Sequence, residues 1–123
     1  MQKQFRNASL LLAIALAATS LTGCASSIID ATKYDAIVDV RTPMEFAQGH
    51  LQGAINVDVE DPSFITNIEQ LSKTGDYILY CHSGNRAGVA LGAMQQDGFT
   101  GEIVNAGGYE EASAATGLPL VTN

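Results

Sequence analysis

Short apolar runs alternate with helix-like periodicity along most of this chain. Runs rich in Ile, Val, Leu, Ala and Tyr predict buried strands over residues 36–40, 54–57, 77–81 and 101–105. Between these runs, apolar residues that recur about one turn apart predict amphipathic helices. Strands that alternate with helices along a chain are typical of a parallel sheet. The pattern therefore predicts an α/β fold, a small open parallel β-sheet flanked by helices.

The first predicted helix carries an unusually complete start signal. Thr42 can act as its N-cap, Pro43 occupies the first helical position, and Glu45 can complete a capping box. Gly49 is expected to end this helix. A second helix is expected after residues 61–63, with its apolar face formed by Phe64, Ile65, Ile68 and Leu71.

Two further helices are expected in the second half of the chain. The spacing of apolar residues predicts a helix over residues 86–97 that Gly98 ends. A strand break is expected at Gly107 and Gly108. A last helix then follows over residues 109–116, with Gly117 and Pro119 as its stop signal.

The stretch from residue 77 to 90 combines these signals with a thiol. Its strand is expected to end at Cys81, and Gly84 and Asn85 suit a tight loop before the helix that begins at Arg86. The thiol would then face a helix N-terminus, where unpaired N–H groups and the helix dipole favour negative charge. Such surroundings, with an arginine nearby, favour the thiolate form of a cysteine. Ligands of open α/β sheets also bind at the carboxyl ends of strands, so Cys81 is a candidate nucleophile.

Structural alternatives exist for each of these residues. An isolated cysteine after a strand is often a small buried hydrophobe, although the loop and Arg86 favour use of Cys81. Arg86 can instead pair with a carboxylate. His82 either acts as a base beside the nucleophile or points outward and tunes the local charge.

The N-terminus has the features of an export signal. Lys3 and Arg6 precede an apolar stretch over residues 8–21 that is too short and too interrupted by polar residues to span a bilayer. The sequence Leu21-Thr22-Gly23-Cys24 resembles the bacterial lipobox, so residues 1–23 are expected to form a lipoprotein signal peptide, with Cys24 lipidated. The Ala after this cysteine suggests sorting to the outer membrane. Residues 24–35 are expected to be a tether, on the periplasmic side of a bacterial cell envelope, and 36–123 the domain.

Charge and cysteine count narrow the partners. The full chain has a formal net charge of −7, and without residues 1–23 four basic side chains face thirteen acidic ones. A surface this acidic repels phosphate, so nucleic acid is not an expected partner, and membrane attachment would rest on lipid alone. If Cys24 carries lipid, Cys81 has no intramolecular disulfide partner.

Three groups of residues, in the right order, resemble the rhodanese homology domain. They are Asp39 to Phe46 with Gly49 to Asn56, Cys81 to Arg86 with a helix after it, and Gly98-Phe99 with Val104 to Gly108. The resemblance covers residues 36 to about 117 and is greatest to small, exported, single-domain members of the phage-shock type. The segment before residue 36 is shorter than usual in the family, and Tyr109 stands where many members carry Trp.

The resemblance implies sulfur transfer without cofactor or metal. Cys81 would take sulfur from a sulfane donor such as thiosulfate, hold it as a persulfide and pass it to cyanide or a thiol. Arg86 would bind the donor's oxyanion or shape the loop. The residues expected to hold the persulfide are His82, Ser83, Gly84, Asn85 and Ala87. Those expected to brace the site as a polar network are Asp39, Arg41, Glu45 and His50. Arg41 is expected to form a structural ion pair, with substrate contact as the alternative.

Other functions have less support from the sequence. Related phosphatases and arsenate reductases place five residues between their cysteine and arginine, whereas four separate Cys81 from Arg86, a loop better sized for sulfur than for phosphate. A non-catalytic or redox-sensing binding module of the envelope is the main alternative, and the presence of both residues argues against it. The spacing of His50, Cys81 and His82 matches no common zinc site. The oligomeric state is left open.

Overall fold

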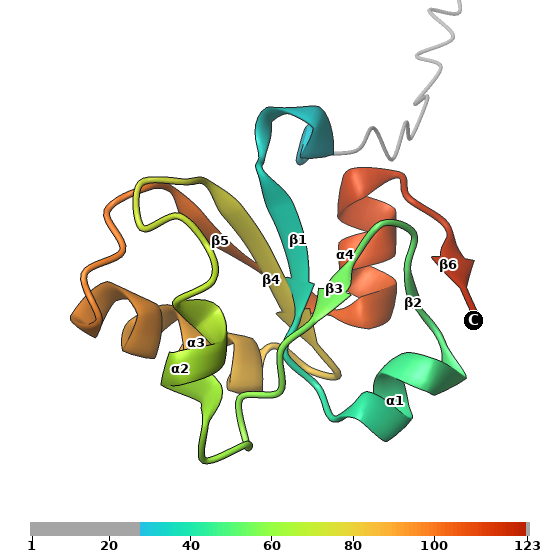
Figure 1. The fold of residues 1–123 in the computed structure, drawn as a ribbon. Coiled ribbons are helices and arrows are strands. Elements are labelled where there is room, and N and C mark those ends of the chain that lie inside the picture. Colours follow the sequence, from blue (N-terminus) through green and yellow to red (C-terminus); the bar gives the residue numbers. More distant parts are fainter. Residues whose placement is uncertain (1–27, 123) are drawn as a thin grey trace, which may run out of the picture.

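A four-stranded parallel sheet forms the centre of the molecule in the computed structural model, which describes residues 28–122 (Figure 1). Its strands lie in the order β3-β1-β4-β5, and every neighbouring pair is parallel. The predicted α/β class is confirmed. The strands are β1 (Ala36–Asp39), β3 (Ile55–Asn56), β4 (Tyr77–Cys81) and β5 (Ile103–Gly108). The helices are α1 (Pro43–Gln48), α2 (Phe64–Ile68), α3 (Asn85–Gln96) and α4 (Tyr109–Thr116).

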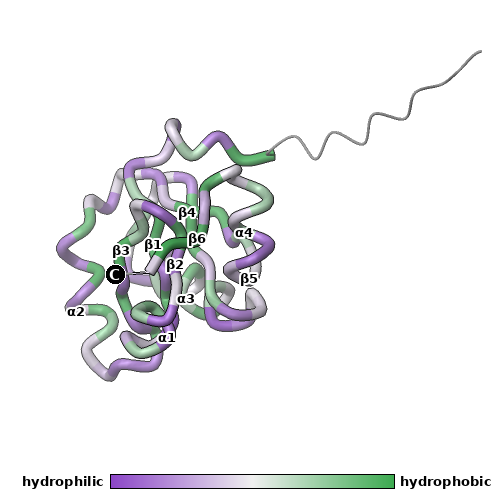
Figure 2. Tube along the Cα trace, turned by 90° about the vertical axis from the view of Figure 1, so that its right-hand side faces the viewer, coloured by the Kyte–Doolittle hydropathy of each residue, from purple (hydrophilic) through white to green (hydrophobic). Residues whose placement is uncertain are grey.

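β4 is buried along its whole length, because helices cover both faces of the sheet. Tyr77, Leu79 and Cys81 belong to the first core cluster, on the side of α2 and α3. The alternate residues Ile78 and Tyr80 belong to the second core cluster, on the side of α4. Figure 2 shows the apolar residues concentrated on the inner strands. Cys81 therefore ends a strand that the sheet holds firmly from both sides.

The start signal of α1 is present as predicted. Thr42 accepts a hydrogen bond from the backbone N–H of Glu45, and the Glu45 side chain accepts one from the N–H of Thr42. Gly49 follows as the C-cap. The α2 helix is shorter than its predicted face, and only Phe64 and Ile68 of that face are fully buried.

The predicted strand break at Gly107 and Gly108 is wrong, because β5 continues through both residues. Gly108 pairs with Cys81 beside an irregularity in the β4 register. A Cβ atom at Gly108 would lie 2.3 Å from the carbonyl oxygen of His82. Glycine is needed here so that the strand can approach the loop after Cys81, and the sequence alone suggested a chain break.

Residues 28–35, the second part of the expected tether, pack against the domain. They include a 3₁₀ turn, η1 (Ala31–Lys33), which Asp30 caps. The N–H of Ile29 donates to the carbonyl of Ala115 at 2.9 Å, and the N–H of Asp35 donates to that of Asp76 at 2.8 Å. The expected signal peptide, the lipidation at Cys24 and the rest of the tether lie outside the described residues. Within residues 28–122, the helices are too short or too polar to cross a membrane.

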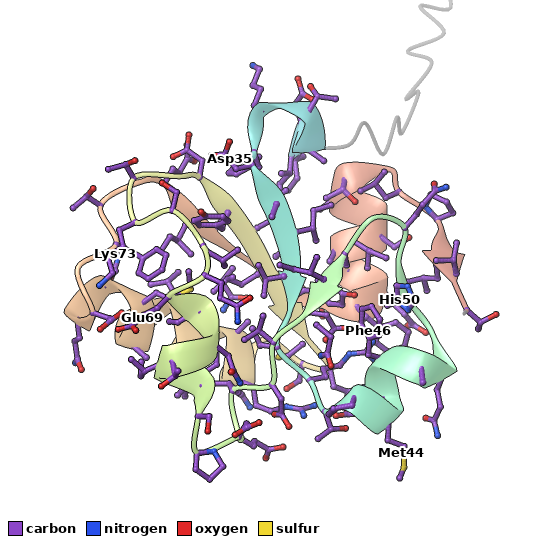
Figure 3. All side chains as sticks on the ribbon, in the orientation of Figure 1. Asp35, Met44, Phe46, His50, Glu69 and Lys73 are labelled. Atoms are coloured by element: carbon purple, nitrogen blue, oxygen red, sulfur yellow. The ribbon has the colours of Figure 1, made fainter. Side chains whose placement is uncertain are left out.

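A second, two-stranded sheet was not predicted. β2 (His50–Leu51) pairs antiparallel with β6 (Leu120–Val121), in a region where the sequence suggested a turn and a chain end. Two-residue strands carry no usable periodicity, so hydrophobic patterning could not find them. This sheet fixes His50 beside α1, where its ring stacks on Phe46 with 3.7 Å between the ring centres (Figure 3).

Candidate functional site

Cys81 lies at the carboxyl end of β4, four residues before the start of α3. The chain turns through residues 82–84, and Gly84 (φ +96°) serves as the N-cap of α3 in the left-handed conformation. Its N–H donates to the sulfur of Cys81 over 2.9 Å. The N–H groups of the first turn of α3 have no acceptor within the helix, and among residues 28–122 no side chain caps them. The predicted juxtaposition of a sulfur with a helix N-terminus is present.

The same sulfur is completely shielded from solvent. Cys81 is 0% exposed and belongs to the first core cluster, together with Val40, Ala87 and Ala90. The structure thus combines features of the two alternatives for this cysteine, because the side chain is buried and its sulfur is also hydrogen-bonded by the loop. Its use as a nucleophile stays a prediction.

The side chains of the loop differ in exposure. His82, Ser83 and Asn85 are exposed, whereas Ala87 is buried in the core. Ala87 can therefore contribute its backbone N–H to a bound anion but not its side chain. The His82 ring stacks on that of Tyr109, the first residue of α4, with 5.8 Å between the ring centres.

Asn105 in β5 forms hydrogen bonds both to the loop and to its own strand. Its side-chain amide donates to the carbonyl of Gly84 at 3.0 Å, and its side-chain oxygen accepts from the N–H of Gly107 at 2.9 Å. Because the Gly84 carbonyl is fixed in this way, the peptide group to which it belongs cannot turn freely. The sequence included Asn105 in the family resemblance but gave no reason to assign it a role in the site.

Arg86 forms a bidentate ion pair with Glu45 of α1. Both of its terminal nitrogens lie 2.8 Å from a carboxylate oxygen, and Glu60 lies 3.6 Å away. The hydrogen bonds from Arg86 lower the pKa of Glu45 to about 2, although partial burial acts in the opposite direction. The structural alternative for Arg86, pairing with a carboxylate, is the arrangement present here. Binding of a donor oxyanion by Arg86 stays a prediction.

Asp39 and Arg41 form a separate, buried ion pair. The Nη2 of Arg41 lies 2.6 Å from Asp39 and donates to the carbonyl of Gly49 at 2.6 Å. Nε of Arg41 also donates to the Asp39 carboxylate. The guanidinium lies over the ring of Tyr109 at 4.9 Å and near that of Tyr80 at 5.7 Å. The ion pair that the sequence favoured for Arg41 is confirmed.

His50 takes no part in either pair. Its Nδ1 lies 2.8 Å from the carbonyl of Phe46, and the ring is almost completely buried. The four residues expected to form one polar network are thus divided: Asp39 pairs with Arg41, Glu45 pairs with Arg86 from outside the set, and the His50 ring contacts Phe46 of α1. The reason is that Glu45 pairs with Arg86, which is distant in sequence, while Asp39 pairs with Arg41.

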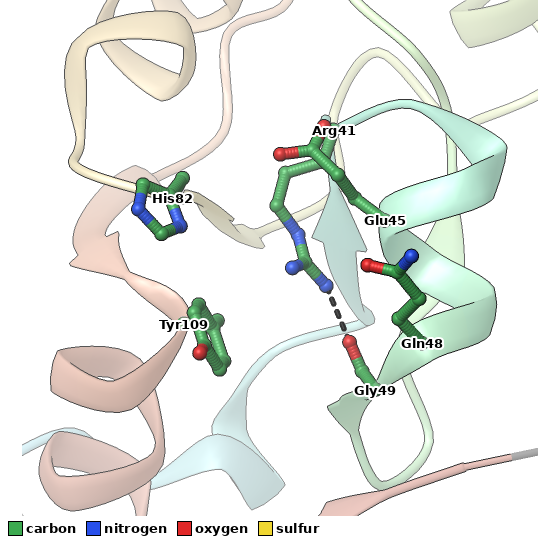
Figure 4. Close-up of a pocket in the computed structure, with 6 residues that line it drawn as sticks. All are labelled: Arg41, Glu45, Gln48, Gly49, His82 and Tyr109. Atoms are coloured by element: carbon green, nitrogen blue, oxygen red, sulfur yellow. Dashed lines mark hydrogen bonds between the residues drawn. The ribbon is translucent and has the colours of Figure 1, made fainter.

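A cavity of about 240 Å³, named here the Arg41 pocket, opens beside the loop (Figure 4). It is lined by Arg41, Glu45, Gln48, Gly49, His82 and Tyr109. Gln48, Gly49 and Tyr109 were not among the predicted site residues. The pocket joins the ends of β1 and β4 to α1 and α4, which no sequence pattern links. Among residues 28–122, no three or more His, Cys, Asp or Glu side chains are placed to hold a metal ion.

This geometry suits an anion more than a metal. An anionic sulfur species at Cys81 would meet the N–H of Gly84 and the unpaired N–H groups of the first turn of α3. Such donors stabilise negative charge without a titratable group.

Comparison with known proteins gives a family for this arrangement. The model of the rhodanese-like domain family matches residues 22–115. The chain is 38% identical over 92 residues to "Thiosulfate sulfurtransferase 16, chloroplastic" of Arabidopsis thaliana, an alignment that covers 67% of this chain and 76% of the plant protein. It is 31% identical over 74 residues to "Thiosulfate sulfurtransferase PspE" of Escherichia coli, covering 60% of this chain and 70% of that protein.

Solved structures agree with the sequence matches. The structure described as "rhodanese with anions from E. coli" superimposes with a TM-score of 0.57 and 29% identity. The match covers 72% of this chain and 98% of the other. The likeness therefore extends over most of this chain and nearly all of the solved one.

Proposed function

The chain belongs to the rhodanese-like domain family, and from this premise we propose that it is a sulfurtransferase that carries sulfane sulfur on Cys81. Relatives named as thiosulfate sulfurtransferases support sulfur transfer of the rhodanese type. The observation that carries the proposal for this chain is the hydrogen bond from the Gly84 N–H to the sulfur of Cys81. This N–H and the start of α3 would stabilise a negative charge on the sulfur, which supports the proposal.

Loading of the cysteine is a nucleophilic displacement. The Cys81 thiolate attacks the outer sulfur of thiosulfate, the S–S bond of the donor breaks, and sulfite leaves with the bonding electron pair. The product is the Cys81 persulfide anion. We propose that the loop N–H groups and the helix dipole of α3 hold this anion, and that His82, Ser83 and Asn85 line its exposed side.

Discharge of the persulfide restores the thiolate. Cyanide or an acceptor thiolate attacks the terminal sulfur, the S–S bond of the persulfide breaks, and Cys81 leaves as a thiolate. The products are thiocyanate or the persulfide of the acceptor. No net oxidation occurs across the two steps, so the reaction balances without an external oxidant or reductant.

Intact-protein mass spectrometry tests the loading step. After treatment with thiosulfate and removal of the excess donor, the wild type is expected to gain the mass of one sulfur atom. Cys81→Ser is expected to gain none, because the attacking atom is absent. An unchanged wild-type mass across thiosulfate, polysulfide and an organic persulfide would rule out sulfur transfer by this chain.

A non-catalytic or redox-sensing module is the second candidate, and the complete burial of Cys81 favours its non-catalytic form, because a redox-sensing thiol must be accessible. A buried thiol in a module without activity should resist both persulfidation and alkylation in the folded protein. In an enzyme, small donors reach the sulfur past the exposed loop residues. The mass measurement therefore separates an enzyme from a non-catalytic module, and catalytic turnover with cyanide or a thiol separates an enzyme from a redox sensor.

We propose that the protein works at the periplasmic side of a bacterial envelope, attached to the outer membrane by lipid on Cys24. The lipobox-like sequence ending at Cys24 supports this. Incorporation of labelled palmitate into the full-length chain, and its loss in Cys24→Ser, is the expected result. Labelling that Cys24→Ser does not abolish would contradict it.

A further inference from the structure

We propose that the Arg41 pocket is the binding site for the acceptor, and that it selects a small organic thiol bearing a carboxylate. The inference rests on the proposed function and names a substrate class for the same site. Arg41 would bind the carboxylate while the thiol end reaches the persulfide on Cys81. The evidence comes from the free donor of Arg41, the walls of the pocket and its position next to the loop.

One terminal nitrogen of the Arg41 guanidinium is available to bind a ligand. Nε and Nη2 donate to Asp39, and Nη2 also donates to the carbonyl of Gly49. Among the described residues, Nη1 makes no hydrogen bond. Figure 4 shows this second terminal nitrogen on the side of the pocket that His82 and Tyr109 form. The side chain as a whole is only 4% exposed, and its contacts with Asp39 and Gly49 fix the position of this charged donor in the wall of the cavity.

Immobility and low exposure both favour a carboxylate ligand. Asp39 fixes the guanidinium plane, and a charge-assisted hydrogen bond from a fixed donor costs little ordering on binding. The stacked rings of His82 and Tyr109 form an adjacent wall, which suits a short carbon skeleton. A cavity of about 240 Å³ lies somewhat below the usual size of drug-sized pockets and suits a small molecule.

The position of the pocket suits an acceptor for the sulfur on Cys81. Asp39 of β1 is in register with Tyr80 of β4, so Arg41 and His82, each two residues further on, emerge at the same edge of the sheet. His82 follows Cys81 directly and also lines the pocket. A molecule held by Arg41 thus extends towards the loop, where its thiolate can attack the terminal sulfur.

Three acceptors that differ in the charge of one group test this assignment with the wild-type protein. Cys81 is first loaded with thiosulfate, and its discharge is followed with 3-mercaptopropionate, 3-mercaptopropionamide and cysteamine, each rate divided by the thiolate concentration. The carboxylate is expected to react about tenfold faster than its neutral amide, the effect of one charge-assisted hydrogen bond. Long-range repulsion by a chain of net charge −7 predicts the opposite order. Equal rates, or a faster amide, would overturn the inference.

Substitution of the arginine gives an independent test. Arg41→Lys keeps a positive charge opposite Asp39 but removes the planar fork, so the ratio of carboxylate to amide rates is expected to fall close to one. Lys33→Gln removes a positive charge from η1 and is expected to keep the wild-type ratio. A preference that persists in Arg41→Lys would contradict the assignment. If this variant does not fold, the comparison of the three acceptors on the wild type still decides.

The two proposals fail in different ways. If thiosulfate adds no sulfur to Cys81, the proposed function is lost. If the persulfide forms and discharges without preference for the carboxylate, only the assignment of the Arg41 pocket is lost.

Discussion

Individual residues in this site serve structure and chemistry at once, and Glu45 is the clearest case. Its carboxylate completes the capping box of α1 and also pairs with Arg86 at the start of α3. One side chain therefore links two helices whose N-termini both lie near the site. The strength of that link depends on the charge of Glu45.

Glu45→Gln is expected to lower stability in a pH-dependent way. Because Arg86 lowers the pKa of Glu45 from 4.5 to about 2, the pairing stabilises the fold above about pH 4.5 and its contribution disappears as the pH falls towards 2. The pair is partly exposed, so we expect a loss of only about 1 kcal/mol at pH 7. Urea unfolding at pH 7, 4 and 3 should show the difference between wild type and variant shrinking with acid. Glu69→Gln, at an exposed position, is the control, and a difference that stays constant with pH would contradict the ion-pair explanation.

Asn105 is expected to act as a positioning residue for the loop. Asn105→Ala removes the hydrogen bond to the Gly84 carbonyl, so the Gly84 N–H is held less firmly towards Cys81. We expect loading by thiosulfate to slow about tenfold, as for the loss of one hydrogen bond that acts on the reaction. Asn105→Asp keeps the acceptor for Gly107 but loses the donor to Gly84, and separates the two contacts.

A pH profile distinguishes positioning from stability. If Asn105 orients the loop, the pH dependence of Cys81 alkylation should change in Asn105→Ala as well as its rate. A lower melting temperature with an unchanged pH profile and loading rate would show a purely structural role.

At the level of elements, the approach of β5 to the loop matters most for the site. Gly107 and Gly108 let the strand run against the backbone of residues 82–84. The Cα of Gly107 would lie 3.3 Å from a Cβ built on Gly84, so there is little space on either side of this contact. The loop is therefore shaped by a neighbouring strand as well as by its own sequence.

Gly108→Ala is expected to disturb this contact. The added Cβ would meet the His82 carbonyl at 2.3 Å, so strand and loop must separate, at a cost of about 1–3 kcal/mol and with slower loading of Cys81. Gly92→Ala is the matched control, because nothing lies within 4 Å of its new Cβ and alanine favours a helix such as α3 by roughly 0.5–1 kcal/mol. Thermal unfolding and the loading assay, run on both variants, measure these effects. Wild-type stability and loading in Gly108→Ala would show that the close approach is not required.

The whole molecule carries a negative charge that opposes its proposed donor. Arginines 41 and 86 each face carboxylates, so the site has little net positive charge to offset the −7 of the chain. Recognition of an anion must then rely on short-range N–H donors, while the long-range field repels it.

Loading by thiosulfate is therefore expected to become faster as salt increases. Raising the ionic strength from 0.01 to 0.15 M shortens the screening length from about 30 to about 8 Å, which weakens the repulsion of a dianion. Stopped-flow measurement of loading, with an uncharged organic trisulfide as control, should show an increase for thiosulfate alone. A decrease with salt would mean that a local positive field outweighs the charge of the whole chain.

Local sequence patterns were sufficient to predict the fold class, the limits of α1 and α4, those of α3 to within one residue, and the position of Cys81 at a strand end. These features depend on local patterns: apolar periodicity, capping residues and glycines within a few positions of each other. Even the Asp39–Arg41 pair is local, because its partners are two residues apart.

The burial of Cys81, the pairing of Arg86 with Glu45 and the hydrogen bond from Asn105 to the loop depend on tertiary structure. The partners of these contacts lie far apart in the chain, 41 residues for Glu45 and Arg86 and 21 for Gly84 and Asn105. The Arg41 pocket likewise combines residues from four separate segments. Which distant residues meet depends on how the sheet and helices pack, and residue type and spacing do not encode that packing locally.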